Sequence, residues 1–490
     1  QVLTNDPKDP KSLSQNSITD LYKSSNGIVW IGTYKQGVNY FNENAVKFSY
    51  YHHREAARGT LPYDDVNRFV EDKRGNLWIG TNGSGLIYFD RTANTFKQYL
   101  HNPANRNSIS NNVIVSLLID HQDKLWIGTY FGGLSSFDGK TFTHYRHSDA
   151  DAGSLSDDRV WEIYEDRERN LWVGTLDGGL DLLDRKTGKF EHYQYRPGRP
   201  SPLQSNYISA LLQDRKGALW IGTATGVTVF EKGKTTPVHY ISTGTPKSIS
   251  NSNIISLLED GRGRIWVGTR EGLNLFEEAT KTFRSFSTAD GLPGNTILNI
   301  VEDNRQTLWI STPNGLCNIQ VKEDGPNMAL SVIHYDESNN LQGREFNENA
   351  ALKTRAGELI FGGPRGFNII HPDKIDKPAS RPKIVFTSLQ IANREVEVGQ
   401  EVNGRIVLSE ALPESKDIHL SYKENVFSIE FASLHFSHST RDKYAYMLEG
   451  FNASWLYTDG SQRRVTYTNL DPGDYTFKVK VLNNSGVWSE

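Results

Sequence analysis

The sequence predicts an all-β fold, in which a β-propeller of repeated blades is followed by an Ig-like β-sandwich. The first observation is a Leu-Trp-Ile-Gly-Thr motif that recurs with few changes. Seven of the ten tryptophans take its second position, at spacings of 43 to 48 residues. A period of that length made of short strands is typical of propeller blades. The second observation is that the period ends after Asp373, where shorter alternating segments begin. The motif tryptophans are Trp30, Trp78, Trp126, Trp172, Trp220, Trp266 and Trp309.

One unit of the repeat predicts four short strands. Val66–Val70 is rich in β-forming residues, and the motif strand Leu77–Gly80 follows it across the turn Asp72–Gly75. Asp can hydrogen-bond its own backbone two residues on, and Gly accepts a positive φ, so this segment favours a tight turn. Leu86–Phe89 and the alternating segment Thr95–Tyr99 complete the unit. Each unit therefore predicts an antiparallel meander of four strands.

The number of units sets the expected number of blades. A weaker copy of the motif at Leu359–Gly363 brings the total to eight, which favours eight blades, with seven as the alternative. The last unit has no fourth strand after Gly366–Ile370, so we expect Gln1–Thr4 to close the ring. The motif tryptophans are expected to be structural, because burying one removes roughly 150–250 Å² from water. At about 25 cal/mol/Å² this contributes some 4–6 kcal/mol at most.

The remainder of the chain predicts a second domain. Lys377–Pro382 has the composition of a linker, and Asn425–Phe431 and Tyr475–Val481 alternate strictly between apolar and polar residues. Short strands separated by turns over about a hundred residues are typical of a β-sandwich. The expected boundaries are a propeller over residues 1–376 and a sandwich over 377–490.

Composition and charge exclude several classes of function. The 54 basic and 58 acidic residues are scattered and give a net charge of −4. Nucleic-acid binding needs a clustered positive field and is not expected. The single cysteine, Cys317, can form neither an internal disulfide nor a cysteine metal site, and no metal or cofactor is predicted. The longest apolar run, Val113–Ile119, is far too short to span a bilayer.

Both halves of the sequence resemble known modules. The unit with Ser12–Ser14, Trp30–Thr33 and Gly37-Val38 is similar to the two-component regulator propeller repeat. The segments Tyr444–Phe451 and Gly473–Phe477 resemble the triple-tyrosine (Y_Y_Y) domain. Their order resembles the periplasmic sensor of hybrid two-component systems in Bacteroides-type bacteria.

That resemblance implies a function, a location and partners. Members commonly sense oligosaccharides and switch on genes for polysaccharide utilisation, through a histidine kinase beyond a membrane helix. The resemblance implies a periplasmic location, an oligosaccharide ligand and a homodimer through the C-terminal sandwich. It also implies a second propeller upstream, and propellers that are usually seven-bladed.

The ligand is expected where the repeats differ, because the shared positions are used by the fold. Propellers commonly bind around the axis, on the face that carries the loops between the second and third strands and between successive blades. Aromatic rings stack on sugars, and charged groups bind hydroxyls or carboxylates. The first strands should line the axial channel, where charged residues either bind a ligand or merely plug the channel or face solvent. The candidate ligand-binding residues are Tyr34, Lys35, Arg68, Tyr130, Phe131, Arg159, Trp161, Glu162, Asp177, Arg270 and Arg365.

Two other classes of function remain as alternatives. Propellers also host lyases and glycosidases, but the recurring acid of the first turn indicates a turn rather than an active site. Neither a nucleophile motif nor a phosphate-binding loop is present. Histidines cluster in the fourth strands, at the blade edges, which is poor geometry for a shared metal ion. No catalytic residue is predicted, and a protein-interaction scaffold is the third class.

Overall fold

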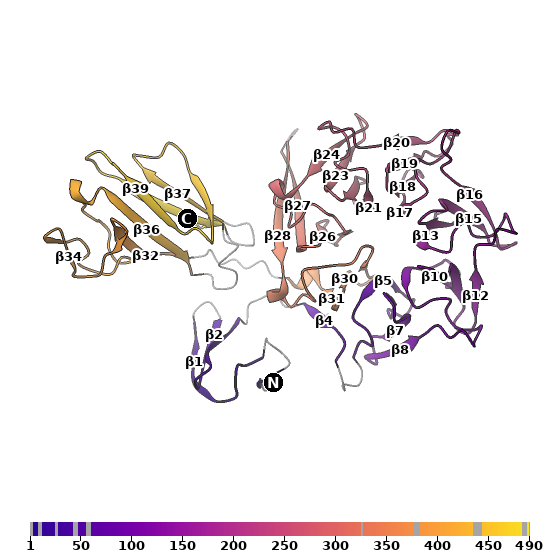
Figure 1. Cartoon of the computed structure of the whole chain (residues 1–490), viewed down its shortest axis with the longest axis horizontal. Coiled ribbons are helices and arrows are strands. Elements are labelled where there is room, and N and C mark those ends of the chain that lie inside the picture. The colour runs from indigo at the N-terminus through magenta and orange to yellow at the C-terminus, as the bar shows by residue number, and fades with distance from the viewer. Residues whose placement is uncertain are drawn as a thin grey trace. The chain divides into compact units, whose positions relative to one another are not determined.

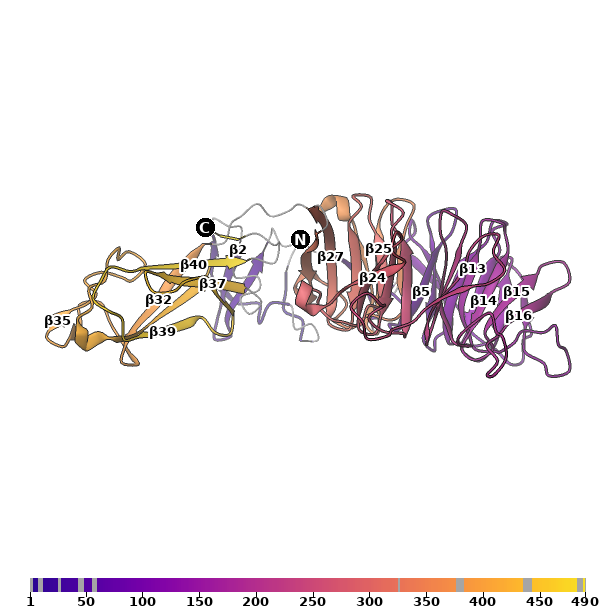
Figure 2. The same ribbon diagram turned by 90° about the horizontal axis from the view of Figure 1, so that it is seen from above.

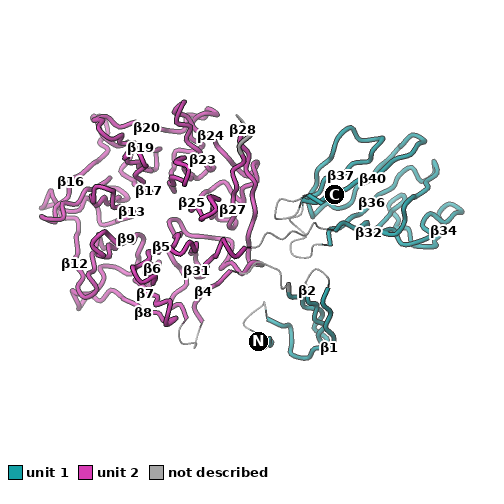
Figure 3. Tube along the Cα trace, turned by 180° about the vertical axis from the view of Figure 1, so that it is seen from behind, with its two compact units in different colours: residues 1–46, 376–490 teal, residues 47–375 magenta. Residues whose placement is uncertain are grey.

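The computed structural model describes residues 3–7, 12–24, 28–42, 48–54, 60–324, 327–375, 383–434, 443–482 and 488–489. The chain divides into two compact units (Figure 3). One comprises Lys47–Ile375, and the other comprises Gln1–Val46 together with Asp376–Glu490. The predicted all-β fold is confirmed, because strands make up nearly all the regular structure in both units.

The unit Lys47–Ile375 is a β-propeller. Within the described residues it contains seven four-stranded antiparallel sheets arranged around an axis (Figure 1), and Figure 2 shows these blades edge-on. Six blades use consecutive strands. Their strands are β5–β8 (Val66–Glu71, Leu77–Thr81, Leu86–Asp90, Thr95–Tyr99), β9–β12 (Ile114–Ile119, Leu125–Thr129, Leu134–Phe137, Phe142–Tyr145), β13–β16 (Val160–Glu165, Leu171–Thr175, Leu180–Asp184, Lys189–Tyr193), β17–β20 (Ile208–Gln213, Leu219–Thr223, Gly226–Phe230, Val238–Tyr240), β21–β24 (Ile254–Glu259, Ile265–Thr269, Gly272–Glu277, Thr282–Phe286) and β25–β28 (Asn299–Glu302, Leu308–Thr312, Gly315–Asp324, Asn327–Tyr335).

The seventh blade closes the ring with a strand from the other end of the unit. Its strands are β29 (Ala351–Lys353), β30 (Leu359–Gly363), β31 (Gly366–Ile370) and β4 (Ser49–Tyr51). The expectation that Gln1–Thr4 closes the ring is wrong, because β4 holds that position. Gln1 and Val2 lie outside the described residues, and Leu3 and Thr4 are in no strand.

The first repeat is not a blade of the ring. The favoured count of eight blades is therefore wrong, and the ring has seven. Its strands β1 (Ile18–Lys23), β2 (Ile28–Thr33) and β3 (Gly37–Asn42) form a separate three-stranded sheet in the other compact unit. The residues expected to supply its fourth strand, around Lys47–Tyr50, instead contribute β4 to the seventh blade. The propeller therefore starts at residue 47 rather than at residue 1.

The repeated motif holds each blade together and spaces it from the next. In five blades the indole Nε1 donates to the Asp that opens the preceding turn, as from Trp220 to Asp214 at 2.9 Å. The motif Thr donates to a turn carbonyl, as Thr129 does to Gly133. A Cβ on Gly128 would lie 2.7 Å from Val160 of the next blade, so only glycine allows this approach. The expectation that the motif is structural agrees with these contacts.

Adjacent blades bury apolar residues between them. Trp126 packs against Val160 and Ile163 of the following blade. Trp78 packs in the same way beside Ile114 and Leu117. The tryptophan face of one blade therefore meets the first-strand residues of the next.

The C-terminal part of the other unit contains two main sheets. Phe431, Tyr444 and Val481 are fully buried in one core that draws on both sheets. The predicted linker Lys377–Pro382, and with it the expected boundary at residue 376, lies outside the described residues. One sheet has the strand order β33-β32-β36-β39 (Arg394–Glu395, Ile384–Ile391, Val426–Ser433, Arg464–Thr468). The other sheet has the order β38-β37-β40 (Leu456–Asp459, Lys443–Glu449, Thr476–Leu482). A separate hairpin is formed by β34 (Glu401–Val402) and β35 (Arg405–Ile406). Short 3-10 helices are η1 (Thr288–Asp290), η2 (Glu337–Asn339) and η3 (Pro372–Lys374) in the propeller and η4 (Tyr422–Glu424) beside the sandwich.

Candidate ligand site at the mouth of the propeller

One end of the propeller gathers the loops that differ between repeats. In an antiparallel meander, the loops between the second and third strands share an end with those that lead to the next blade. Tyr130 and Phe131 lie between β10 and β11, Asp177 between β14 and β15, and Arg270 between β22 and β23. The propeller supplies these side chains from separate blades to one rim, which we call the mouth.

A cluster of aromatic and charged side chains forms on this rim. The Arg270 guanidinium lies 2.7 Å from the Glu348 carboxylate. Burial, followed by the negative charge of Glu348, raises the pKa of Tyr207, and Arg270 and Tyr130 are also close enough to act on this hydroxyl. The Trp161 ring centroid is 6.4 Å from that of Tyr207. We call Tyr130, Trp161, Tyr207, Arg270 and Glu348 the mouth cluster.

Arg159 organises a second set of charges on the same rim. Its guanidinium donates to both oxygens of Asp157 and, at 3.3 Å, to Asp177. The hydrogen bond to Asp157 raises the pKa of Arg159, so its positive charge is fixed at neutral pH. Asp177 remains exposed, which leaves its carboxylate open to solvent on one side.

The rim offers the groups that a polyhydroxylated ligand needs. Phe131 is exposed and stands edge-on against Tyr130, with ring centroids 4.5 Å apart. The Arg270 side chain is also about half exposed. Aromatic faces stack on the apolar faces of sugar rings, while guanidinium and carboxylate groups bind hydroxyls. The arrangement can bind such a ligand without providing an obvious nucleophile.

Arg68 and Glu162 meet at the axis of the ring. The guanidinium lies 2.5 Å from the carboxylate, and the two side chains are only 17% and 8% exposed. They belong to β5 and β13, the first strands of two blades that are not neighbours, so the pair reaches across the channel. Burial raises the pKa of Glu162, and the charge of Arg68 opposes that rise. Of the two interpretations of these residues, the contacts favour a plug over a ligand-binding pair.

The structure brings together only some of the candidate ligand-binding residues predicted from the sequence. Trp161, Tyr130 and Arg270 join the mouth cluster, whereas Tyr34 and Lys35 lie in the turn between β2 and β3, in the other compact unit. The ammonium of Lys35 lies 5.0 Å from the Tyr34 ring centroid. Their loop follows the same motif as the rim loops of the blades, but their repeat is not a blade of this ring.

The remaining candidate, Arg365, lies in the exposed turn between β30 and β31. Its carbonyl accepts a hydrogen bond from the Tyr50 hydroxyl of the closing strand at 2.8 Å. The exposed guanidinium is thus carried by the closing blade.

Two residues of the mouth cluster were missed at the level of sequence. Tyr207 stands directly before β17, which is the repeat position that Arg159 occupies before β13. Comparing the residue before each first strand would have found it. Glu348 lies in the loop before β29, in the repeat whose motif is weakest, so its position could not be inferred by alignment of the repeats.

The histidines at the blade edges have structural partners. The Nδ1 atoms of His53, His101 and His147 lie 2.7–3.0 Å from the carbonyl oxygens of Leu61, Ile109 and Leu155. Each therefore fastens the end of a fourth strand to the loop that follows. These contacts explain why histidine recurs at this position.

One group of potential metal ligands is already neutralised by an arginine. Asp120, His121 and Glu165 bring their ligand atoms within 4.8 Å of one another. Arg185 donates to Asp120 and to Glu165, at 2.6 Å each. A guanidinium in this position does not fit a bound cation.

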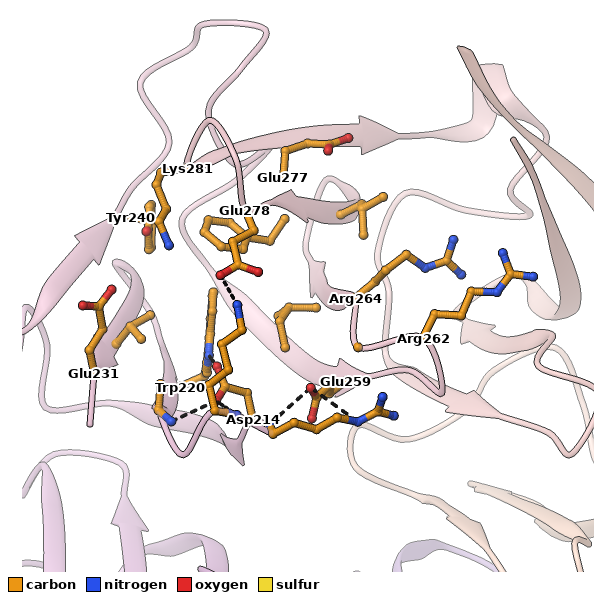
Figure 4. Close-up of a pocket in the computed structure, with 18 of the residues that line it drawn as sticks. Asp214, Trp220, Glu231, Tyr240, Glu259, Arg262, Arg264, Glu277, Glu278 and Lys281 are labelled. Carbon is orange, nitrogen blue, oxygen red and sulfur yellow. Dashed lines mark hydrogen bonds and ion pairs between the residues drawn. The ribbon is translucent and has the colours of Figure 1, made fainter. Parts of the chain in front are cut away.

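The opposite end of the blades carries a groove of about 890 Å³ (Figure 4). It lies between the blades β17–β20 and β21–β24, over Trp220 and Phe276. Several of its charged rim residues pair with one another, as Arg215 does with Glu259 at 3.7 Å and Lys216 with Glu278. We therefore place the candidate site at the mouth rather than in this groove.

Comparison with known proteins identifies both modules. The family described as two component regulator propeller matches seven segments, and the Y_Y_Y domain matches residues 435–490. The propeller segments are residues 12–35, 60–83, 108–131, 154–177, 202–225, 248–271 and 291–314.

Two relatives show where such modules occur. The chain is similar to an extracellular domain assigned to a hybrid two component system of B. thetaiotaomicron, with 27% identity and a TM-score of 0.77. That match covers 99% of this chain and 62% of the solved chain. A segment of 156 residues, 32% of the chain, is 32% identical to histidine kinase P4 of Formosa agariphila and spans 11% of that kinase. The chain thus spans only part of each relative, and in the described residues none of the helices has the length and apolar character to cross a bilayer.

Proposed function

Because the chain is built from two component regulator propeller repeats and a Y_Y_Y domain, we propose that it is the ligand-sensing region of a hybrid two-component system. We place it in the periplasm, as part of a longer protein whose histidine kinase lies beyond a membrane helix. The similarity to an extracellular domain of this class supports the location. We assign no catalytic step to this region.

The ligand that we propose is an oligosaccharide, bound at the mouth of the propeller. The observation that carries this proposal is the mouth cluster, in which Trp161 and Tyr207 lie beside the Arg270–Glu348 pair. Exposed aromatic and paired charged groups are the usual means of binding sugar rings and their hydroxyls. In the proposed pathway, binding switches on genes for polysaccharide utilisation.

The signal is proposed to pass through a homodimer of the C-terminal sandwich. Two observations support an interaction surface there. Leu456 and Tyr457 of β38 are exposed, and so is Phe451 in the neighbouring loop. These exposed apolar side chains are the ones through which two sandwiches would pack in the proposed dimer. Ligand binding would then change the distance between the two sandwiches of the dimer.

Calorimetry and thermal unfolding with polysaccharide digests test the proposal. A ligand at about 100 times its dissociation constant adds roughly 2.7 kcal/mol to the stability of the propeller. We expect Trp161→Ala and Arg270→Ala to weaken binding at least tenfold, because each removes a contact from the mouth. Arg215→Ala, which alters the groove at the opposite end, is the matched control and should bind normally.

The same incubations separate the alternative functions. Release of shorter sugars would show a carbohydrate-active enzyme instead of a sensor. Unchanged affinity in folded Trp161→Ala and Arg270→Ala proteins would remove the mouth from consideration. Absence of both binding and turnover across the digests would favour a protein-interaction scaffold.

A further inference from the structure

One position of the third strand binds the loop that leads into the blade, and in one blade this position is charged. Asn274 on β23 accepts a hydrogen bond from the Ser250 backbone N–H at 2.9 Å. Asn368 on β31 does the same for Gln342 at 2.7 Å. In the blade β13–β16 the equivalent residue on β15 is Asp181. A carboxylate there replaces the neutral amide of the two other blades.

A histidine faces this carboxylate from the fourth strand. His192 on β16 is the cross-strand neighbour of Asp181, with Nδ1 2.6 Å from the carboxylate and Nε2 2.9 Å from the Ala152 carbonyl. Both of these oxygens are acceptors, so each ring nitrogen needs a hydrogen and the ring carries a positive charge. That charge compensates Asp181, whose side chain is fully buried. In the blade β21–β24 the same contact is neutral, from the Ser285 hydroxyl to Asn274.

The contact between His192 and Asp181 depends on pH with a definite sign. The hydrogen bond to Asp181, followed by the charge of Asp181 and the contact with the Ala152 carbonyl, raises the pKa of His192 against the effect of burial. A histidine with a raised pKa contributes stability that is fully present below its unfolded pKa of about 6.5. This contribution is lost as the pH rises through the folded pKa. Other charged groups of the same loop have partners of their own, in the pairs Asp151–Lys189, Asp158–Arg146 and His147–Asp149.

The segment that Asp181 binds leads directly into the mouth. The second carboxylate oxygen of Asp181 accepts a hydrogen bond from the Ser156 backbone N–H at 2.8 Å. Asp157, the next residue, holds the Arg159 guanidinium through both of its oxygens. A Cβ on Gly178 would lie 2.2 Å from the Ser156 Oγ, so the rim turn after β14 packs against the same residue. The position of Arg159 at the rim therefore depends on Ser156.

We propose that protonated His192 and Asp181 form a positioning pair for the ligand site, which holds Arg159 at the mouth in acid and releases it as the pH rises. The inference rests on the proposed function, because Arg159 belongs to the rim where the ligand is placed. It extends that function by making ligand affinity depend on pH. Both residues act through Ser156 and Asp157.

Hydrogen exchange in the 490-residue chain tests the pair without any ligand. Protection factors for peptides spanning residues 150–159 should fall by a factor on the order of 10 between about pH 6 and about pH 8.5. The equivalent loop, residues 244–253, is bound by Asn274 and should keep its protection. The proposal is overturned if the first loop shows no fall, or if both loops fall equally.

A second histidine provides an internal comparison for the titration itself. His239 occupies the same repeat position on β20, but it faces the neutral Thr228 hydroxyl at 3.0 Å, and burial lowers its pKa. In NMR spectra of the chain with labelled histidine, His192 should therefore titrate at a higher pH than His239. The opposite order would show that His192 is not held as a cation.

Two variants separate His192 from His147, which lies in the same loop. Asp181→Asn keeps an acceptor for Ser156 but presents an amide N–H to His192, so it favours the neutral ring. Protection of residues 150–159 should then no longer fall as the pH rises. Asp181→Asn/His192→Ser copies the neutral pair of the blade β21–β24 and should be protected at both pH values. If either variant keeps the full pH dependence of the parent, His147 carries that dependence and the positioning pair is refuted.

Calorimetry with polysaccharide digests connects the pair to the ligand site. Affinity for a digest that binds should fall between the same two pH values, and Asp181→Asn should remove that fall. Constant affinity, while the exchange of residues 150–159 changes, would refute the role of the pair at the ligand site and leave the proposed function intact. If no digest binds at either pH, the proposed function fails instead, and hydrogen exchange still decides whether the pair positions the loop that holds Arg159.

Discussion

The ion pair at the axis of the propeller gives the sharpest prediction about stability. Glu162→Gln keeps the size of the side chain but removes the charge opposite Arg68, which is only 17% exposed. The carbonyl of Asn349, at 3.4 Å, is then the remaining acceptor described for this guanidinium. A buried cation loses its carboxylate in this variant, while the packing of the channel stays nearly the same.

The expected cost follows from the burial of the pair. Removing one partner of a buried ion pair typically costs about 3–5 kcal/mol, because the other charge stays desolvated and uncompensated. The amide of Gln can still accept one hydrogen bond, so we expect about 3 kcal/mol for Glu162→Gln. The double variant Arg68→Met/Glu162→Leu should lie within about 1 kcal/mol of the parent, since well-packed apolar residues replace such pairs at little cost.

The pH dependence of a third variant has a definite sign. In Arg68→Met the buried Glu162 loses its counter-charge, and burial raises the pKa of this carboxyl above its unfolded value. A buried carboxyl whose pKa is raised destabilises the folded state at pH values above that pKa. The lost stability is recovered as the pH falls and the carboxyl takes up a proton. The difference in the free energy of unfolding between the parent and Arg68→Met should therefore become smaller as the pH falls from 7 towards 5.

Urea unfolding followed by tryptophan fluorescence measures these differences, since six motif tryptophans lie in the ring. A loss of unfolding free energy below about 1 kcal/mol for Glu162→Gln would refute the interpretation of this ion pair as a structural plug. So would a double variant whose loss of stability equals the sum of the losses of the two single variants. Reduced sugar affinity in a Glu162→Gln protein of unchanged stability would instead return the pair to the ligand site.

Two further predictions concern the fold. Asp214→Ala removes the acceptor of the Trp220 indole and of two backbone N–H groups. We expect it to lower the free energy of unfolding by about 2–3 kcal/mol in the same assay. A loss of stability below about 0.5 kcal/mol would show that the turn forms without this carboxylate. In the sandwich unit, burial is outweighed by hydrogen bonds from Ser421, Asn403 and Arg405, which lower the pKa of Glu424 to about 2. This depressed pKa contributes stability above about pH 4.3 that is lost as the pH falls towards 2. The protection factors of the β36 amides, which correct for the slower intrinsic exchange in acid, should therefore be lower at pH 3 than at pH 6, and Glu424→Gln should remove that difference.

The repeat predicted the construction of each blade, but not which repeats share a ring. Four strands per unit, the turn acid and the structural tryptophan follow from local sequence. Ring membership depends instead on pairing between Ser49–Tyr51 and Phe367–Ile369, which are about as far apart as the ring is long. The first repeat has Ser24 in place of the turn acid, but the last blade of the ring has Thr354 there, so this position does not separate the first repeat from the members of the ring.

The candidate site was predictable only where one repeat differs visibly from its neighbours. Trp161 stood out because other units carry smaller or apolar residues there, such as Ser209 and Ile255, and Arg270 because it lies in a loop that differs between units. Glu348 did not, because it acts through its contact with Arg270 across two blades. The indole hydrogen bond to the turn acid was likewise missed, because spacing alone does not show which way a side chain turns.

The closing blade also has a mechanical consequence. The chain enters the propeller at β4 and leaves it after β31, and these two strands pair with each other through three residue pairs. Ser49, where β4 begins, pairs with Ile369, next to the end of β31, so tension applied between the two connections of the ring would unzip this short pairing from that end before it reached any other blade. The seventh blade is thus the part of the ring that opens first under load. The force that separates β4 from β31 sets the largest tension that the propeller can transmit without opening.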